Sequence, residues 1–330
     1  MQNNQMGSLD ILDFLSRKKS KQILGRGFNS IIYRKALILK EFLTGNADIK
    51  RTFWSLMPES IRPSTFNKED DLDIKLLHKL LYKYFSYDLI EPVNLLGHKW
   101  SYGSLNRMGD KKDSNSGFMT FLTLLEDIII KDQYNAKEFL NSEDSKVVLD
   151  CGANIGIFSL WVHYLSPESK IYSFEPTKST FEILEKNIKT NNLDKKIFAF
   201  NMALGDTQKK TVIRIDKEGG LGACNSLIDS KCLISTVILQ EVSMVTLDDF
   251  VQGNNLPRVD FIKIDTEGYE KQIIKGACNT IRKFSPIISC AAYHFQNDKV
   301  EIPKLVKSIN LNYHYKLLKR SEEDLIFWVN

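Results

Sequence analysis

From residue 146 onward, the chain repeats one pattern, in which a short run of branched apolar residues is followed by another regular segment. The runs SKVVLDC, KIYSFEP, KIFAFNMAL, VDFIKID and SPIISCAAY have the length and composition of buried strands. Most of them are separated by amphipathic helical segments, such as the one that places Phe181, Leu184 and Ile188 on one face. Strands that alternate with helices form a parallel sheet that is covered on both faces and wound right-handedly. The sequence therefore predicts a doubly wound α/β domain.

Two further β-like runs interrupt this alternation between KIFAFNMAL and VDFIKID. They are TVIRI (211–215) and VSMVTL (242–247), and the glycine-rich stretch EGGLGACNSL lies between them. We predict that they form an insertion over the edge of the sheet. The tail segments LNYHYKLLKR and LIFWVN alternate in the manner of a hairpin, in which Trp328 serves packing.

Capping residues give the expected helix limits. Ser179, with Glu182 three residues later, predicts a capping box at the start of the second helix, and Asn191-Asn192 predict its end. Thr246 and Asp249 fit the first turn of a short helix, TLDDFV.

The 330-residue chain is long enough for one catalytic domain and an extension. Residues 1–115 carry no chemical motif, but Ile74, Leu77, Leu81 and Tyr84 follow helical spacing. We predict a mainly helical accessory region there and a catalytic domain over 116–330, with the polar loop GDKKDSNSG (109–117) at the boundary.

Cysteine content and hydropathy exclude several classes of protein, whereas charge does not. The net charge of +4 neither requires nor excludes an anionic partner, and the five cysteines form no C-x-x-C pair, which disfavours a disulfide scaffold and a zinc knuckle. The N-terminus lacks the features of a signal peptide, and no run of about 18 apolar residues occurs. These features predict a cytoplasmic protein without a membrane span. They do not predict its oligomeric state.

The stretch VVLDCGANIGIFSLW (147–161) predicts a ligand site where the first strand passes into the first helix. Gly152 and Gly156 let the backbone approach a ligand, and the following helix directs its N-terminus at the same place. The spacing is neither the dinucleotide G-x-G-x-x-G nor a P-loop. Asp150 repels a pyrophosphate but favours the amino group of a cationic, zwitterionic ligand, of which S-adenosylmethionine is an example.

Glu175 ends the second strand, where an acid accepts hydrogen bonds from both hydroxyls of a ribose. A nicotinamide-binding fold uses an acid at the same place. Glu175 therefore predicts a nucleoside without identifying it.

Five blocks in order resemble the FkbM-type family of S-adenosylmethionine-dependent methyltransferases over roughly residues 120–320: VVLDCGANIGIFSL, YSFEP, NMALGD, VTLDDFV and IKIDTEGYEKQIIKGA. The resemblance implies a class I fold with a seven-stranded sheet whose last strand is antiparallel. It also implies O-methylation of a sugar, a glycan or a natural-product hydroxyl.

By position, the resemblance places Asp150, Gly152, Asn154 and Gly156 around the methionine part of the cofactor and Glu175 on its ribose. It places the loop after Asn201 and Ala203 near the adenine, where Asp206 orders the loop. A turn cap explains Asn201 and Asp206 equally well. The predicted set of cofactor contacts is completed by Ala153, Pro176 and Asp265.

Methyl transfer to an alcohol needs an aligned hydroxyl and a group that removes its proton. Asp265, Glu267 and His294 follow the fourth and fifth strands of the parallel set, beside the expected position of the sulfur. We predict that these three residues are catalytic, with His294 as the base because its usual pKa is near neutrality. Asp298 either orients His294 or caps the next helix. The alternatives are a helix cap for the acids and a structural histidine.

Asp265, Glu267 and His294 also form an adequate ligand set for a divalent cation, although their spacing is no recognised signature. The loop EGGLGACNSL can close over an acceptor, with Asn225 and Ser226 as hydrogen-bonding groups. Two other functions stay open, an RNA 2'-O-methyltransferase and a non-catalytic nucleoside-binding or scaffold protein of this fold. Carboxylates beside the reaction centre disfavour nucleic acid, so we expect a small-molecule or saccharide acceptor.

Overall fold

The computed structural model describes residues 93–95, 98–101, 121, 124–216, 237–320 and 322–330. The predicted helix over 74–84, the boundary loop at 109–117 and the loop with Asn225 and Ser226 lie outside these residues. The chain divides into two compact units, Met1–Ser101 and Tyr102–Asn330. In the first unit, β1 (Val93–Leu95) and β2 (His98–Trp100) form an antiparallel pair.

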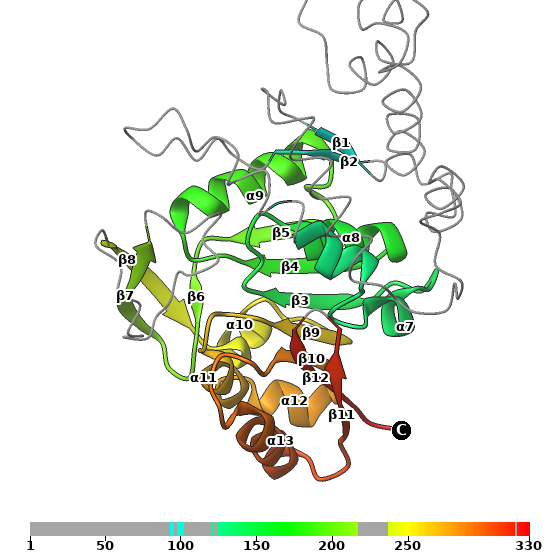
Figure 1. Cartoon of the computed structure of the whole chain (residues 1–330), viewed down its shortest axis with the longest axis vertical. Coiled ribbons are helices and arrows are strands. Elements are labelled where there is room, and N and C mark those ends of the chain that lie inside the picture. Colours follow the sequence, from blue (N-terminus) through cyan, green and yellow to red (C-terminus); the bar gives the residue numbers. More distant parts are fainter. Residues whose placement is uncertain (1–92, 96–97, 102–120, 122–123, 217–236, 321) are drawn as a thin grey trace, which may run out of the picture. The chain divides into compact units, whose positions relative to one another are not determined.

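The second unit is built on a seven-stranded sheet with the order β11-β12-β10-β9-β3-β4-β5 (Figure 1). The strands are β3 (Val147–Cys151), β4 (Lys170–Phe174), β5 (Ile197–Phe200), β9 (Phe261–Ile264), β10 (Ile287–Ala291), β11 (His314–Lys319) and β12 (Glu323–Trp328). The predicted doubly wound sheet is therefore confirmed.

The last strand, β12, runs antiparallel to both of its neighbours, β10 and β11. The other neighbouring pairs in the sheet are parallel. This confirms the predicted antiparallel last strand and the terminal hairpin. The strand order reverses between β3 and β9, and ligands of such sheets bind beyond the carboxyl ends of the strands at that point.

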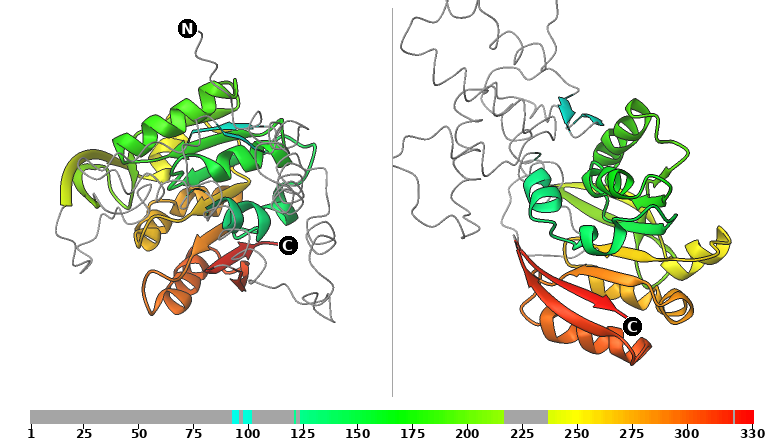
Figure 2. Two further views of the ribbon diagram at one scale, coloured as in Figure 1. Left: turned by 45° about the horizontal axis from the view of Figure 1, so that its top comes forward. Right: turned by 90° about the vertical axis from the view of Figure 1, so that its right-hand side faces the viewer.

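Helices cover both faces of the sheet (Figures 1 and 2). The main core contains side chains from one set of helices, namely α10 (Leu247–Gly253), α11 (Glu270–Lys275), α12 (Cys278–Phe284) and α13 (Asp298–Ile309). The opposite face carries α7 (Ala136–Leu140), α8 (Ile157–Leu165) and α9 (Lys178–Thr190). Strand β3 lies between these layers with every residue buried, which explains its continuous run of apolar residues.

The third predicted strand is divided in the structure. KIFAFNMAL forms β5 and then β6 (Ala203–Leu204), which pairs with a different sheet. That three-stranded sheet has the order β6-β8-β7, with β7 at Lys209–Asp216 and β8 at Val237–Val245. The predicted extra strands are therefore present. The prediction failed at Asn201 and Met202 because a continuous apolar pattern does not reveal a change of sheet.

One predicted cap is wrong and two are confirmed. Helix α9 begins at Lys178 with Thr177 at its N-cap, so Ser179 lies within the first turn and forms no capping box. Asn191 ends α9, and the Thr246 hydroxyl accepts a hydrogen bond from the Asp249 N–H at 3.0 Å to start α10. Among the described residues, no helix has the combined length and hydrophobicity required to cross a bilayer.

Candidate active site

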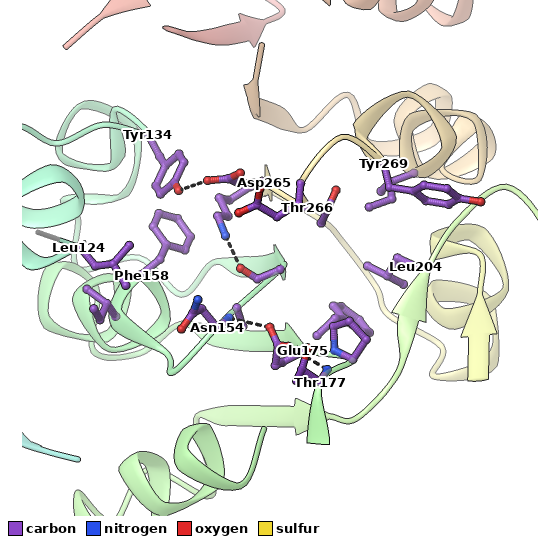
Figure 3. Close-up of a pocket in the computed structure, with 18 of the residues that line it drawn as sticks. Leu124, Tyr134, Asn154, Phe158, Glu175, Thr177, Leu204, Asp265, Thr266 and Tyr269 are labelled. Atoms are coloured by element: carbon purple, nitrogen blue, oxygen red, sulfur yellow. Dashed lines mark hydrogen bonds between the residues drawn. The ribbon is translucent and has the colours of Figure 1, made fainter. Parts of the chain in front are cut away.

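A cavity of about 350 Å³ opens at the carboxyl ends of β3, β4 and β9, where the strand order reverses. Its volume is in the range of small-molecule sites. Polar groups lie at two ends, as Figure 3 shows, with Asn154, Glu175 and Thr177 at one end and Tyr134 and Asp265 at the other. Apolar side chains also line the cavity, among them Phe174, Met202, Leu204, Ile213 and Ile273.

Gly152 forms the turn after β3 and has a φ of 81°, which favours glycine. Its N–H and that of Ala153 both donate to the Phe174 carbonyl, at 3.1 and 2.8 Å. A Cβ on Gly152 would lie 2.0 Å from the backbone carbonyl oxygen of Asp265. The absence of a side chain therefore lets the turns after β3 and β9 meet at the floor of the cavity.

Glu175 lies at the end of β4 with 7% of its surface exposed. One carboxylate oxygen accepts from the Asn154 N–H at 3.1 Å, and the other accepts from the Thr177 N–H at 2.9 Å. Burial raises the pKa of Glu175 to about 7, although these N–H donors and Lys263 act in the opposite direction. The carboxyl group is thus oriented toward the cavity but titrates near neutrality.

Asp150 does not line the cavity. It is fully buried, accepts from the Ser159 hydroxyl at 2.6 Å and pairs with the Lys263 ammonium at 3.2 Å. Lys263 also donates to the Gly152 carbonyl at 2.6 Å and does line the cavity. Asp150 therefore acts on this site through Lys263, whereas the sequence predicted that it faces the ligand's amino group.

Asp265 lies at the other end of the cavity and accepts hydrogen bonds from two tyrosines. The Tyr134 hydroxyl donates to Oδ2 at 2.6 Å, and the Tyr293 hydroxyl lies 3.2 Å from Oδ1 and 3.3 Å from Oδ2. Burial, and next the charge of Asp265, raise the pKa of both tyrosines. Both hydroxyls therefore stay protonated and hold the carboxylate in one orientation.

Glu267, which also lines the cavity, has a φ of 56°, so the extended geometry of β9 ends before it. His294 contacts both carboxylates, with Nε2 3.9 Å from Asp265 Oδ1 and 3.4 Å from Glu267 Oε2. Its Nδ1 lies 3.2 Å from Oε1 of Glu270. The structure therefore brings together the three residues predicted to be catalytic and adds Glu270.

The carboxylates around His294 argue against its expected role as the base, because they raise its pKa. Burial alone lowers the pKa of this imidazole, but Glu267, Glu270 and Asp265 together raise it to about 11. His294 is thus charged at neutral pH. The usual pKa of histidine, on which its expected role as the base rested, therefore does not apply to His294 in the folded chain.

A divalent cation was predicted to bind Asp265, Glu267 and His294 if it binds at all. Within the part of the chain that the structure describes, the ligand atoms that lie within 4.8 Å of one another belong to Asp265, Glu270 and His294. Such an ion would have to displace the proton from His294. The Asp265 oxygens already accept from tyrosines, and Glu270 Oε1 accepts from the Thr266 and Gly268 N–H groups. This arrangement does not fit a metal site, and we derive no step through a cation.

The interactions of Asp298 support its expected role at the start of the next helix rather than as a partner of His294. Its carboxylate accepts from the Phe295 N–H at 2.8 Å and pairs with Lys271 at 3.1 Å. Asp298 is the first residue of α13, so it stabilises the entry to that helix.

The remaining predicted cofactor residues divide into two groups. Ala153, Asn154, Pro176 and Ala203 line the cavity together with Gly152 and Glu175. Gly156 lies outside the lining and packs against Leu184, while Asn201 is exposed and donates to the Glu175 and Pro176 carbonyls. Asp206 is exposed as well. Asn201 therefore orders the turn after β4 rather than lining the cavity.

Besides Glu270 and Tyr293, sequence reasoning missed four further groups at or beside this site. Tyr134 precedes the first predicted strand, Lys263 lies inside a buried strand, Glu322 is in the turn before β12, and Asp324 is within β12. Lys263 carried a signal, because a lysine in the buried run VDFIKID requires a partner for its charge. The other three could be placed only once the tertiary structure was known.

Asp324 is a buried carboxyl group with 1% of its surface exposed. Neither of its oxygens has a well-placed hydrogen-bond partner in the described ranges. Burial, and next the charges of Asp265 and Glu322, raise its pKa to about 8. Since this folded-state pKa exceeds the unfolded value, the protein loses stability as pH rises from about 4 to 8.

We expect Asp324→Asn to be more stable than the parent chain above pH 8, by about 1–3 kcal/mol in free energy of unfolding. The amide has no proton to lose, so the advantage should shrink toward pH 5. Urea unfolding at pH 5 and pH 8.5 measures the difference. Asp194→Asn, at an exposed aspartate, should change stability equally at both pH values. A pH-independent difference for Asp324→Asn would contradict the raised pKa.

A match to one family model shows the family of this chain. The model of the Methyltransferase FkbM domain matches residues 150–317, which is just over half of the chain. "Methyltransferase 1" of Beauveria bassiana is 26% identical over 165 residues, which cover 46% of this chain and 65% of that protein. "Hexuronic acid methyltransferase AglP" of Haloferax volcanii is 23% identical over 185 residues, which cover 56% of this chain and 71% of that protein.

Among solved structures, the chain is similar to the methyltransferase FkbM from Methylobacillus flagellatus KT, with 18% identity and a TM-score of 0.44. The match covers 68% of this chain and 56% of that one. Since the family model spans β3 to β11, including the cavity turn and the Asp265–Glu270 segment, the chain belongs to the FkbM methyltransferase family.

Proposed function

We propose that this chain is an S-adenosylmethionine-dependent methyltransferase that methylates a hydroxyl of a sugar, a glycan or a natural product. The observation that carries the proposal is one cavity with a ribose-type carboxyl, Glu175, at one end and the Asp265–Glu267 pair at the other. When bound, the cofactor supplies an activated methyl group on a sulfonium. The protein must therefore bind it, exclude water and orient an acceptor.

The donors and acceptors of the cavity suit the parts of such a cofactor. Glu175 offers two carboxylate oxygens to vicinal hydroxyls, and Met202 and Leu204 offer an apolar wall to a purine. Gly152, Ala153 and Asn154 bring the backbone to the site without bulky side chains. Asp265 provides a fixed negative charge for a cationic ligand.

The acceptor end favours an alcohol over a phosphate-bearing partner. Four carboxylates, those of Asp127, Asp265, Glu267 and Glu322, line the cavity there. The lysine that lines it, Lys263, is already paired with Asp150. The name of the Haloferax volcanii relative assigns that protein a saccharide-derived substrate, which supports the choice of acceptor class.

Two measurements test the proposal. Isothermal titration of the full chain with S-adenosylmethionine should show one binding event, and its absence at millimolar ligand would overturn the proposal. Methyl transfer from labelled cofactor should then be assayed against neutral sugars, nucleotide sugars, glycans and RNA, with and without a chelator. Label on a saccharide, undiminished by the chelator, is the expected result.

The two alternatives give other outcomes in the same assays. Label on RNA, with retention of RNA on a filter that falls as salt rises, would favour a 2'-O-methyltransferase. Cofactor binding without transfer to any member of the panel would favour a nucleoside-binding protein of this fold.

A further inference from the structure

We propose that Glu267 is the general base for the acceptor hydroxyl and that His294 is its positioning residue, held by Glu270. This assignment rests on the proposed function. It reverses the roles expected from the sequence, in which the imidazole takes the proton.

Accessibility favours Glu267 over the other members of the cluster. Its carboxylate lines the cavity and its side chain is 34% exposed. The side chains of His294 and Glu270 are 11% and 2% exposed, and neither residue lines the cavity. A base must lie within hydrogen-bond reach of the proton that it removes, so the group on the cavity wall is the stronger choice.

The other carboxylates at this end of the cavity form hydrogen bonds or ion pairs with different groups. Asp265 accepts from the hydroxyls of Tyr134 and Tyr293, which leaves its oxygens committed. Asp127 pairs with Lys131 at 3.1 Å, and Glu322 accepts from the Gln133 amide at 3.4 Å. Glu267 contacts the His294 ring, which does not line the cavity, whereas Glu267 itself does.

The surroundings of His294 stabilise its charged imidazolium form, which disfavours proton exchange. Carboxylates face both ring nitrogens, with Glu270 3.2 Å from Nδ1 and Glu267 3.4 Å from Nε2. Asp265 lies 3.9 Å from Nε2, and Glu322 is a further charged neighbour. An imidazolium that lies between Glu270 and Glu267 fixes the position of the latter by charge and contact.

Glu270 anchors this arrangement through the backbone. Its Oε1 accepts from the Thr266 N–H at 2.9 Å and from the Gly268 N–H at 3.1 Å. These bonds close the turn that carries Glu267, where φ is 56° at Glu267 and 98° at Gly268. A non-glycine residue in the left-handed region costs about 1 kcal/mol or more, and such strain is kept where geometry matters.

The proton-acceptor chemistry is consistent with the charges around Glu267. Burial, and next the neighbouring Asp265, raise the pKa of Glu267, while His294 acts in the opposite direction. A carboxylate with a raised pKa is a better proton acceptor than a solvent-exposed one.

In the proposed step, the acceptor hydroxyl oxygen forms a bond to the methyl carbon while its proton passes to the Glu267 carboxylate. The bond between the methyl carbon and sulfur breaks, and its electron pair stays on sulfur as a neutral thioether. Glu267, now a neutral acid, returns the proton to water after the methyl ether leaves. Atoms and charge balance, because the positive charge lost by sulfur leaves as the released proton.

The first test needs no acceptor. The full chain, labelled with ¹⁵N in its histidine rings, is titrated by NMR from pH 5 to pH 10. Of the five histidines, one should remain protonated above pH 8, and its signal should disappear in His294→Gln. In Glu270→Gln its titration midpoint should fall by at least about one pH unit, a tenfold loss of proton affinity. Titration of every histidine between pH 5.5 and 7.5 would overturn the proposal.

The second test measures single-turnover methyl transfer to the acceptor that responds in the panel. Glu267→Gln should lower the rate by about 10²–10⁴-fold with cofactor affinity nearly unchanged. His294→Gln removes the positive charge beside Glu267, so the acid limb of the pH–rate profile should move to higher pH and part of the rate should return there. Glu241→Gln, at an exposed residue of β8, is the matched control and should change neither quantity.

The roles would be the reverse of ours if His294→Gln abolished the acid limb while Glu267→Gln kept the parental rate. A failure of the proposed function looks different, since the parent chain would then bind no S-adenosylmethionine. The NMR titration remains informative in that case, because it reports the Glu270–His294 contact without the cofactor.

Discussion

Gly152→Ala should destabilise the protein by at least about 3 kcal/mol and remove binding of S-adenosylmethionine. The added methyl group would lie 2.0 Å from the Asp265 carbonyl oxygen, which belongs to backbone and cannot rotate away. The φ of 81° adds conformational strain for any residue with a side chain. Either the turn after β3 or the turn after β9 must move, and both line the cavity. Urea unfolding and isothermal titration measure the two effects.

Gly253→Ala is the matched control for this substitution. Gly253 is the last residue of α10, and a Cβ there would meet nothing within 4 Å. Because alanine favours a helix over glycine by about 1 kcal/mol, this variant should be as stable as the parent or slightly more so. Equal stability of Gly152→Ala and the parent chain would show that the two turns do not pack as described.

Glu175→Gln should weaken binding of S-adenosylmethionine by about 100-fold or more, which corresponds to about 3 kcal/mol. The carboxylate is oriented by the Asn154 and Thr177 N–H groups, and an amide replaces one of its acceptor oxygens by a donor. Isothermal titration at pH 8 measures the change. Glu182 lies in α9 and does not line the cavity, so Glu182→Gln should bind S-adenosylmethionine like the parent chain. An unchanged affinity of Glu175→Gln would mean that the ribose lies elsewhere.

The pH dependence of affinity distinguishes loss of this carboxylate from general damage. Glu175 has a pKa of about 7 when no ligand is bound, and hydroxyl donors favour its ionised form. The affinity of the parent chain should therefore rise as pH increases through 7 and level off above it, by up to about tenfold per unit. The amide side chain of the Glu175→Gln variant does not titrate, so its affinity should not show this rise near pH 7. Isothermal titration of the parent chain and the variant over the same pH range tests the difference.

The part of the fold that the sequence predicted depends on local pattern. The apolar run that ends at Asp150 and the glycine at 152 mark a buried strand and a tight turn without reference to any other segment. Glu175 could be predicted because the first two strands of a doubly wound sheet are neighbours, which fixes where the second one ends. His294 and Glu267 were placed together for the same reason, as both follow adjacent parallel strands.

What the sequence did not predict depends on burial and on distant contacts. Asp150 was expected to face a ligand, because its partner Lys263 is 113 positions away and nothing local indicates that their charges are paired. The protonation of His294 could not be predicted from the sequence either. It depends on Glu270, whose carboxylate contacts the ring and accepts from the Thr266 N–H in the turn after β9. Tyr134 reaches Asp265 from a segment without a motif of its own. In each case the property of a titratable group is set by neighbours that a one-dimensional pattern does not identify.

The position of β12 has a consequence for the order in which the molecule assembles. Strand β11 precedes β12 in the chain, yet it joins the sheet only by pairing with β12, which lies between β11 and β10. A nascent polypeptide can therefore pair β3, β4, β5 and β9 before β11 has any place to dock. The end of the cavity that carries Glu175 should therefore form first during folding, and the wall that carries Glu322 should form last.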